Sequence, residues 1–342
     1  MSPPRRARTR TLAATAALVV LAATGCGGRA TAGGEQVTEL RYQGSVGQVT
    51  LPELAEDLGY LGDVRLDWIG NVTGGPQDVQ ATATGQSDFG GAFNGAIVKL
   101  ASAGAPITAV VSYYGSDAQS FQGYYVLDDS PIRGPRDLIG RKVAMNTLGA
   151  HAEAVLKTWL AGGGLSPAEI RQVELVALPP VNIEQSLRQR QIDVAVLGGV
   201  IRDKAVANGG IRTVFTDYEL LGAFSAGAYV FRDDFIRRNP ETVKTFVTGV
   251  GKAIEWARTQ PRETVVARFE AIIAKRGRNE DPSLVRYWKS SGVAGRGGVI
   301  TDQEFATWID WLAAEGELKG DKPAPGEVYT NRYNPFADGG GA

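Results

Sequence analysis

The sequence predicts an α/β protein of two lobes, because it contains the same succession of elements twice. The first copy runs from a strand and loop at residues 39–47 to a short strand at residues 85–91. The second copy runs from a strand and loop at residues 141–150 to a short strand at residues 190–199. Each copy reads as strand, loop of small residues, helix, strand, helix and short strand. Two such units, joined by extended segments, indicate a cleft between lobes.

The first 26 residues read as a targeting segment, which plays no part in the fold. Four arginines precede an apolar stretch at residues 12–23 that is too short to span a bilayer comfortably. Cys26 follows, and the segment resembles a bacterial lipoprotein signal in which this cysteine becomes the acylated first residue. The resemblance implies an exported chain, lipid-anchored at the outer face of the cytoplasmic membrane in the cell envelope. An ordinary secretory signal with an incidental cysteine is the alternative.

Composition narrows the class of protein. The 342 residues are enough for two domains with cores of their own. Without the four N-terminal arginines, 32 basic side chains face 37 acidic ones, so no nucleic-acid partner is expected. A single cysteine allows no intramolecular disulfide, and His151, the only histidine, is a poor metal site without further ligands. We therefore expect no metal and no cofactor.

Short runs rich in β-branched and aromatic residues predict strands of a mainly parallel sheet flanked by helices. The expected strands are residues 37–42, 64–69, 88–90, 107–113, 123–127, 142–146, 173–177, 193–197, 213–215 and 227–231. Helical spacing between them predicts helices at residues 51–58, 76–84, 95–103, 150–161, 183–189 and 200–207. Several of these helices are followed by a glycine, which is a common helix stop.

The last third of the chain changes character and predicts helices. Helical spacing recurs at residues 240–259, 261–275, 281–290 and 301–314. Proline stands near three of these starts, where its missing N–H costs nothing. Residues 301–304 have the form of a capping box.

These elements predict the domain organisation. Residues 1–26 form the signal and residues 27–36, which lack bulky apolar side chains, form a flexible tether. Lobe 1 begins with residues 37–126, lobe 2 comprises residues 127–226, and residues 227–342 return to lobe 1 and add the C-terminal helices. The extended crossings at residues 123–129 and 225–231 would form the hinge. One continuous doubly wound domain is the alternative.

Six short motifs occur in the order typical of one family. They are residues 74–76 (GGP), 85–89 (GQSDF), 103–106 (AGAP), 137–143 (DLIGRKV), 161–167 (AGGGLSP) and 234–240 (DFIRRNP). From about residue 37 to residue 258 the chain resembles the periplasmic-type substrate-binding proteins of ABC importers, in the nitrate, aliphatic-sulfonate and taurine group. The resemblance implies a type II binding-protein fold, a small-molecule solute, a membrane permease with its ATPase subunit as partner, and a monomer.

Candidate ligand-binding residues stand where strands end and helices begin, because ligands of open α/β sheets bind there. In the first copy these are Ser45, Val46 and Gly47, and in the second they are Thr147, Leu148, Gly149 and His151. Hydroxyl groups, backbone N–H groups and the positive helix ends suit a sulfonate or carboxylate. The further candidates are Gly75, Asn94, Tyr114 and Gly198. All of these residues also fit plain helix capping or core packing, and no arginine in these loops is an evident anion clamp.

The favoured function is therefore capture of a small organic solute, foremost a sulfonate or taurine-like anion, by hinge closure and delivery to a permease. Nitrate, thiamine-type pyrimidines and aromatic acids follow as solutes. A sensory or interaction lipoprotein on the same scaffold is the alternative. Enzyme function is disfavoured, because the sequence has no phosphate-binding loop, no nucleophile elbow and only one histidine.

Overall fold

The computed structural model describes residues 36–72 and 74–337. The described residues all belong to one compact unit. The predicted signal, Cys26, nearly all of the tether and the last five residues lie outside the described part.

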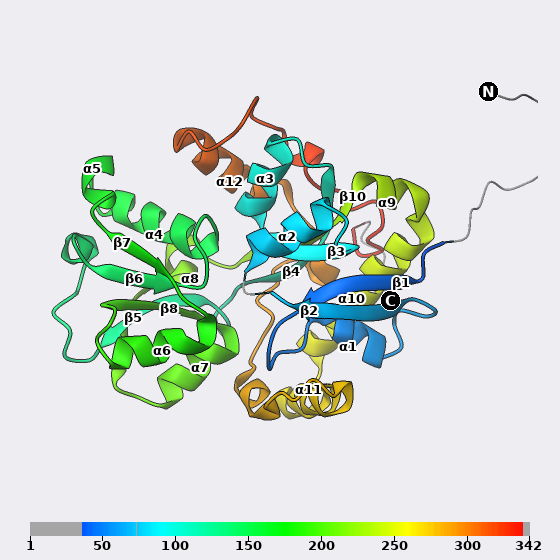
Figure 1. Ribbon diagram of the computed structural model, residues 1–342, viewed down its shortest axis with the longest axis horizontal. Coiled ribbons are helices and arrows are strands. Elements are labelled where there is room, and N and C mark those ends of the chain that lie inside the picture. The colour runs from blue at the N-terminus through cyan, green and yellow to red at the C-terminus, as the bar shows by residue number, and fades with distance from the viewer. Residues whose placement is uncertain (1–35, 73, 338–342) are drawn as a thin grey trace, which may run out of the picture. The chain divides into compact units, whose positions relative to one another are not determined.

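The described residues form three sheets (Figure 1). Their strands are β1 (Glu39–Gly44), β2 (Arg65–Asn71), β3 (Phe89–Phe93), β4 (Ile107–Ser116), β5 (Gln122–Leu127), β6 (Lys142–Met145), β7 (Glu174–Ala177), β8 (Val194–Gly198), β9 (Ile211–Thr216) and β10 (Phe224–Arg232). The strand orders are β1-β2, β3-β10-β4 and β7-β6-β8-β5-β9. Every strand overlaps one of the ten that the sequence predicts.

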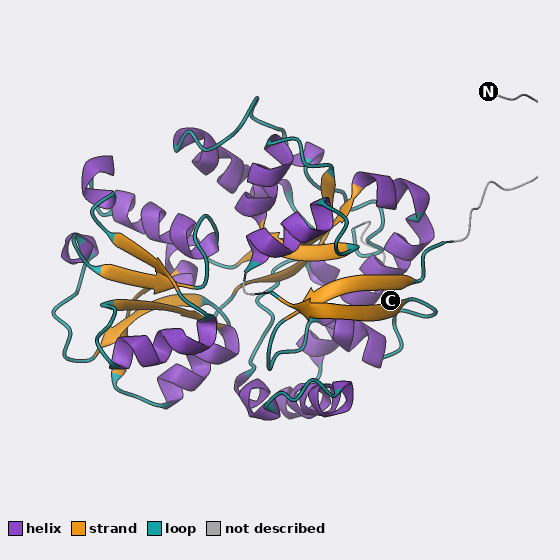
Figure 2. Ribbon diagram, in the orientation of Figure 1, coloured by secondary structure: helices purple, strands orange, loops and turns teal. Residues whose placement is uncertain are grey.

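Helices cover both faces of the five-stranded sheet, with α4 on one face and α6 and α7 on the other (Figure 2). The α-helices are α1 (Leu51–Asp57), α2 (Gly75–Ala83), α3 (Asn94–Ser102), α4 (His151–Gly162), α5 (Pro167–Ile170), α6 (Pro180–Arg188), α7 (Gly199–Ala207), α8 (Asp217–Leu221), α9 (Asp233–Arg238), α10 (Pro240–Thr259), α11 (Arg262–Arg276) and α12 (Asp302–Ala314). The 3₁₀ helices are η1 (Pro135–Leu138), η2 (Pro282–Tyr287), η3 (Arg296–Gly298) and η4 (Pro325–Glu327).

Two expectations about these elements were wrong. The sheets are not mainly parallel: β5 runs antiparallel to β8 and β9, and β10 runs antiparallel to β3 and β4. Strand direction depends on long-range pairing, which short sequence patterns do not record. The segment expected as a helix at residues 281–290 forms only the 3₁₀ helix η2 and then an extended chain. The short helices α5, α8 and α9 were not predicted.

The crossing segments are themselves sheet strands. β5, which spans the expected boundary at residue 126, lies between β8 and β9 in the five-stranded sheet. β10 returns as the middle strand of the sheet formed with β3 and β4. A middle strand is hydrogen-bonded on both edges, so both crossings are firmly anchored at one end.

Three groups of buried apolar side chains hold these layers together. One group packs α10 and α11 against α1 and β1, with Phe89, Phe231 and Phe246 at its centre. A second group lies between β5, β8 and the helices α6 and α7. The largest group runs from the α4 face of the five-stranded sheet to α3 and α12. The C-terminal helix α12 thus packs against α3, and α10 packs against α1.

Candidate functional site

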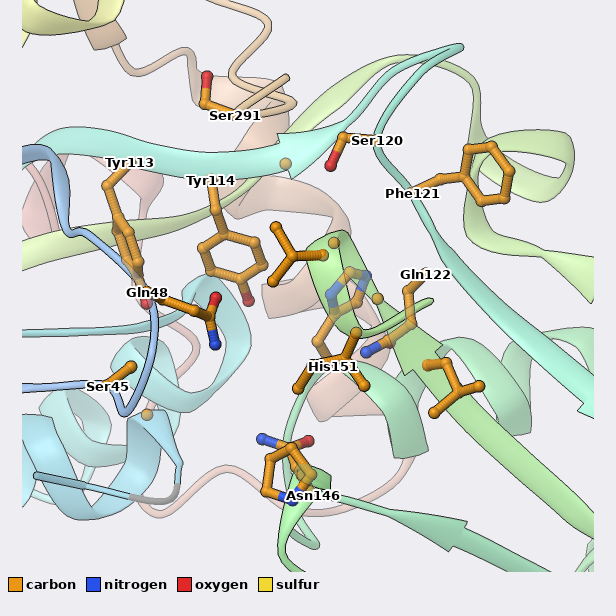
Figure 3. A pocket seen from close by; sticks show the side chains of 18 of the residues that line it. Ser45, Gln48, Tyr113, Tyr114, Ser120, Phe121, Gln122, Asn146, His151 and Ser291 are labelled. Carbon is orange, nitrogen blue, oxygen red and sulfur yellow. The ribbon is translucent and has the colours of Figure 1, made fainter. Parts of the chain in front are cut away.

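A cavity of about 430 Å³ is bordered by segments from both predicted repeats. Its lining comes from the β1–α1 loop, the start of α2, the end of β4, the start of β5, the β6–α4 loop, the β8–α7 junction and the chain after η2. Figure 3 shows Ser45 and Gln48 on one side of the cavity and Asn146 and His151 on another. The two glycine-containing loops that the sequence singles out therefore border the same space.

Six of the predicted site residues line this cavity: Ser45, Gly75, Tyr114, Thr147, His151 and Gly198. The other five do not line it: Val46, Gly47, Asn94, Leu148 and Gly149. Contact of any of these residues with a solute stays a prediction.

The five residues outside the lining have other surroundings. The Asn94 side chain is fully buried, and its Nδ2 donates to the carbonyl oxygens of Ser225 and Glu304 at 3.3 and 3.2 Å. The Gly47 N–H donates to Glu280 Oε1 at 3.1 Å, and Val46 is exposed. Leu148 and Gly149 line a second, more apolar cavity of about 350 Å³ beside α2 and α3.

Two of the helices that begin at the cavity, α2 and α7, have a glycine as N-cap and therefore no side-chain cap. The N-cap residues Gly74 of α2 and Gly198 of α7 supply no side-chain hydrogen bond. Their first-turn N–H groups carry partial positive charge, which favours an anionic ligand group. Glycine is required at Gly75, because a Cβ there would meet the Ala92 Cα at 2.7 Å. The backbone of α2 can approach β3 this closely only without a side chain.

The positive charges beside the cavity are already paired. Lys289 is the one lysine or arginine in the described lining, and its Nζ lies 2.9 Å from Asp203 Oδ1. Asp203 also accepts from the buried Arg202, whose guanidinium stacks on Phe121 at 3.8 Å from the ring centroid. An anionic solute would therefore depend on helix N-termini and hydroxyl groups.

Sequence reasoning missed a buried carboxylate at the start of α8. Asp217 is fully buried and lines the cavity. Its Oδ1 accepts from Ser116 Oγ and from the Gln122 N–H, each at 2.9 Å. Its Oδ2 lies 3.2 Å from His151 Nε2. The Thr216–Glu219 capping box was the available signal, since it places Asp217 at the first position of a helix directly after β9.

Aromatic rings form another wall. Tyr113 and Tyr229 stack at 4.2 Å between ring centroids, and Tyr114 meets Tyr113 edge-on. Burial raises the pKa of all three phenols well above the ordinary value. These side chains therefore stay neutral and offer apolar faces with O–H groups.

Asp78 lies close to these rings, and burial raises the pKa of its carboxyl from 3.8 to about 7, although the Gly91 N–H donates to it at 2.7 Å. A raised folded-state pKa means that the folded chain holds this proton more tightly than the unfolded chain. The resulting stabilisation is present below pH 4 and is lost as the pH rises to about 7. We expect the Asp78→Asn variant to lack this decrease of stability with rising pH.

Relative to the unsubstituted chain, the Asp78→Asn variant should therefore gain about 2 kcal/mol of unfolding free energy between pH 5 and pH 8. Urea unfolding at the two pH values measures this change. The control is Asp63→Asn, because Asp63 is exposed. If the free energy of unfolding depends on pH equally with and without the Asp78 carboxyl, the raised pKa assigned to Asp78 is contradicted.

No group of three or more His, Cys, Asp or Glu side chains in residues 36–72 and 74–337 is arranged to hold a metal ion. Within the same residues, no helix combines the length and the apolar character needed to cross a membrane.

Comparison with known proteins places the chain in a family. The family model described as NMT1/THI5 like matches residues 53–264. A putative binding protein of Brucella abortus (strain 2308) is 26% identical over 200 residues, 56% of this chain and 58% of that protein. The taurine-binding periplasmic protein of Escherichia coli (strain K12) is 29% identical over 187 residues, 53% of this chain and 54% of that protein. The matches thus span little more than half the length of these relatives.

Solved structures agree on the fold. The alkanesulfonate-binding protein SsuA from Xanthomonas axonopodis pv. citri superimposes with a TM-score of 0.67 at 18% identity, over 87% of this chain and 99% of that one. This likeness confirms the predicted α/β binding-protein fold. Both relatives are named as binding proteins, and the taurine-binding protein belongs to the group that the sequence motifs indicated. Because the family model covers more than half of the chain, the protein belongs to the NMT1/THI5-like family.

Proposed function

We propose that this protein is the solute-binding component of an ABC importer and that it acts as a binding protein rather than as an enzyme. It captures a small organic solute and delivers it to a membrane permease with its ATPase subunit. The observation that carries the proposal is a cavity bordered by helix starts from both repeats. Family membership and the names of the relatives support it.

The capture mechanism in this proposal is hinge closure. In this proposal β1 to β4 and the chain from β10 onward act as one lobe and β5 to β9 as the other, so the chain crosses between β4 and β5 and between β9 and β10. Contacts from both lobes to a solute stabilise the closed form, since a ligand shifts a conformational equilibrium by its differential affinity for the two states. The closed form then docks on the permease.

The proposed solute is a sulfonate or a taurine-like molecule. The uncapped starts of α2 and α7 support an anionic head group, because both border the cavity and first-turn N–H groups carry partial positive charge. The aromatic wall at Tyr113 and Tyr114 supports an apolar body. The proposal includes a monomer, exported and lipid-anchored through Cys26 at the outer face of the cytoplasmic membrane.

Substitution of Ser45 and Thr147 together by alanine tests the two loops. Both residues line the cavity, one from each repeat. The double variant should bind the solute at least tenfold more weakly, because two hydroxyl contacts of about 1 kcal/mol each are lost. Isothermal calorimetry measures the affinity, with the strongest binder from a thermal-shift screen of sulfonates, carboxylates, amines and heterocycles.

Thr158→Ala is the matched control, since the Thr158 hydroxyl donates to the Ala154 carbonyl oxygen on the α4 helix and does not line the cavity. Unchanged affinity in the double variant would remove the two loops from the binding site.

A further inference from the structure

We propose that the solute carries a nitrogen hydrogen-bond donor, as an ammonium or amino group, which Asp217 and Gln122 accept. This inference rests on the proposed function and names the substrate class of the same site. It starts from buried polar atoms at one end of the cavity that lack a hydrogen-bond partner.

Asp217 is a fixed acceptor. The Ser116 hydroxyl and the Gln122 N–H both hold its Oδ1 at 2.9 Å, and the side chain is fully buried. Because two donors on different strands set its position, the carboxylate has little freedom to turn toward another partner. Its second oxygen is therefore preorganised for a ligand.

Three buried atoms around this carboxylate are without a hydrogen bond to any described residue. They are Asp217 Oδ2, His151 Nε2 and Gln122 Oε1. The first two are 3.2 Å apart, but they are not aligned for donation by the imidazole N–H. His151 and Gln122 both contact Asp217, and Figure 3 shows their side chains close to each other. An unsatisfied buried acceptor costs about as much as a lost hydrogen bond, so this end of the cavity favours a donor.

The charged side chains that line the cavity also favour a solute with a positively charged donor. The described lining contains the carboxylates of Asp203 and Asp217 but only one lysine or arginine, Lys289, which pairs with Asp203. Asp217 thus has no cationic lysine or arginine partner in the lining. A solute ammonium would supply that charge, whereas a second anion at this end would be repelled.

The apolar surroundings of His151 strengthen this preference for a solute donor at Asp217. Its ring stacks on Phe93 at 5.3 Å and meets Phe224 edge-on. Apolar neighbours exclude water, and hydrogen bonds to a charged acceptor become stronger in such an environment. A solute with an amine at Asp217 and an anionic group at the starts of α2 and α7 would be a zwitterion whose two charged ends are bound at different places in the cavity.

Matched pairs of solutes test the inference. The probes are taurine with ethanesulfonate, 4-(aminomethyl)benzenesulfonate with benzenesulfonate, and benzylamine with benzyl alcohol. By calorimetry with the full chain, we expect the nitrogen-bearing member of each pair that binds to bind at least tenfold more tightly. Equal or tighter binding of the member without nitrogen, or a strongest binder in the wider screen that has no N–H donor, would overturn the inference. A chain that binds no solute of the screen would instead overturn the proposed function.

Variants assign the effect to the named atoms. Asp217→Asn should weaken binding of the nitrogen-bearing probe at least tenfold and leave the matched partner nearly unchanged. The control is Asp88→Asn, because Asp88 is a buried carboxylate that pairs with Arg41 away from the cavity. Gln122→Met serves as a second variant if Asp217→Asn does not fold, since the backbone N–H that holds Asp217 remains. Loss of discrimination within a pair supports the inference, and full discrimination in the folded variant refutes it.

Discussion

Replacement of Glu53 by alanine should lower the free energy of unfolding by about 3–5 kcal/mol. The Glu53 carboxylate is buried and accepts hydrogen bonds from Tyr42 Oη at 2.6 Å, Arg278 Nη1 at 2.9 Å and Arg276 Nη1 at 3.1 Å. Its removal leaves two largely buried guanidinium groups without this partner. Urea unfolding measures the loss.

The same substitution should also weaken solute binding. Arg276 bridges Glu53 and Glu280, and Glu280 accepts the Gly47 N–H in the loop that contains Ser45. This ionic cluster therefore holds one edge of the cavity. The control is Glu263→Ala on the exposed first turn of α11, which should change the unfolding free energy by less than about 0.5 kcal/mol. A loss of similar size in both variants would contradict the role assigned to the cluster.

Gly227→Ala should strongly destabilise the fold beside the cavity. A Cβ at this position would lie 2.1 Å from Tyr114 Cε1 and 2.4 Å from the Ala92 carbonyl oxygen. β10 cannot move away, because it is hydrogen-bonded to β3 on one side and to β4 on the other. We expect a loss of about 3 kcal/mol or more of unfolding free energy, together with weaker solute binding because Tyr114 lines the cavity.

The control is Gly134→Ala, where a Cβ would meet nothing within 4 Å. Thermal and urea unfolding compare the two variants, and calorimetry compares their affinities for the strongest solute. A Gly227→Ala chain as stable as the Gly134→Ala chain would show that β10 does not fix the position of Tyr114.

The secondary structure was predictable because it depends on local patterns. Alternating and β-branched runs marked most strands, and proline or glycine marked many helix ends. Sheet order and strand direction were not predictable, because the pairing of β5 with β8 and β9 joins segments far apart in the chain. The residues after Pro282 failed as an α-helix because that segment packs against α7 and α11, and these contacts outweigh its helical spacing.

The site residues also divide into those that the local sequence predicts and those that only the folded chain brings together. Ser45, Thr147 and His151, which line the cavity, could be selected from the sequence because a loop between a strand and a helix has a recognisable sequence. Asp217 was not predicted, because its role depends on its contacts with Ser116, Gln122 and His151. These residues reach Asp217 only in the folded chain. Asn94 stands at a position in the sequence that is typical of a cleft residue. Its side chain instead joins β10 to α12, because it donates to a backbone carbonyl oxygen of each.

Small-angle X-ray scattering with increasing solute tests the central claim most directly, with the strongest binder of the screen as the probe. If two lobes close over the solute, the radius of gyration should fall in a saturable way, with the same midpoint as the calorimetric titration. A scattering profile that stays unchanged while calorimetry reports saturation would contradict capture by closure.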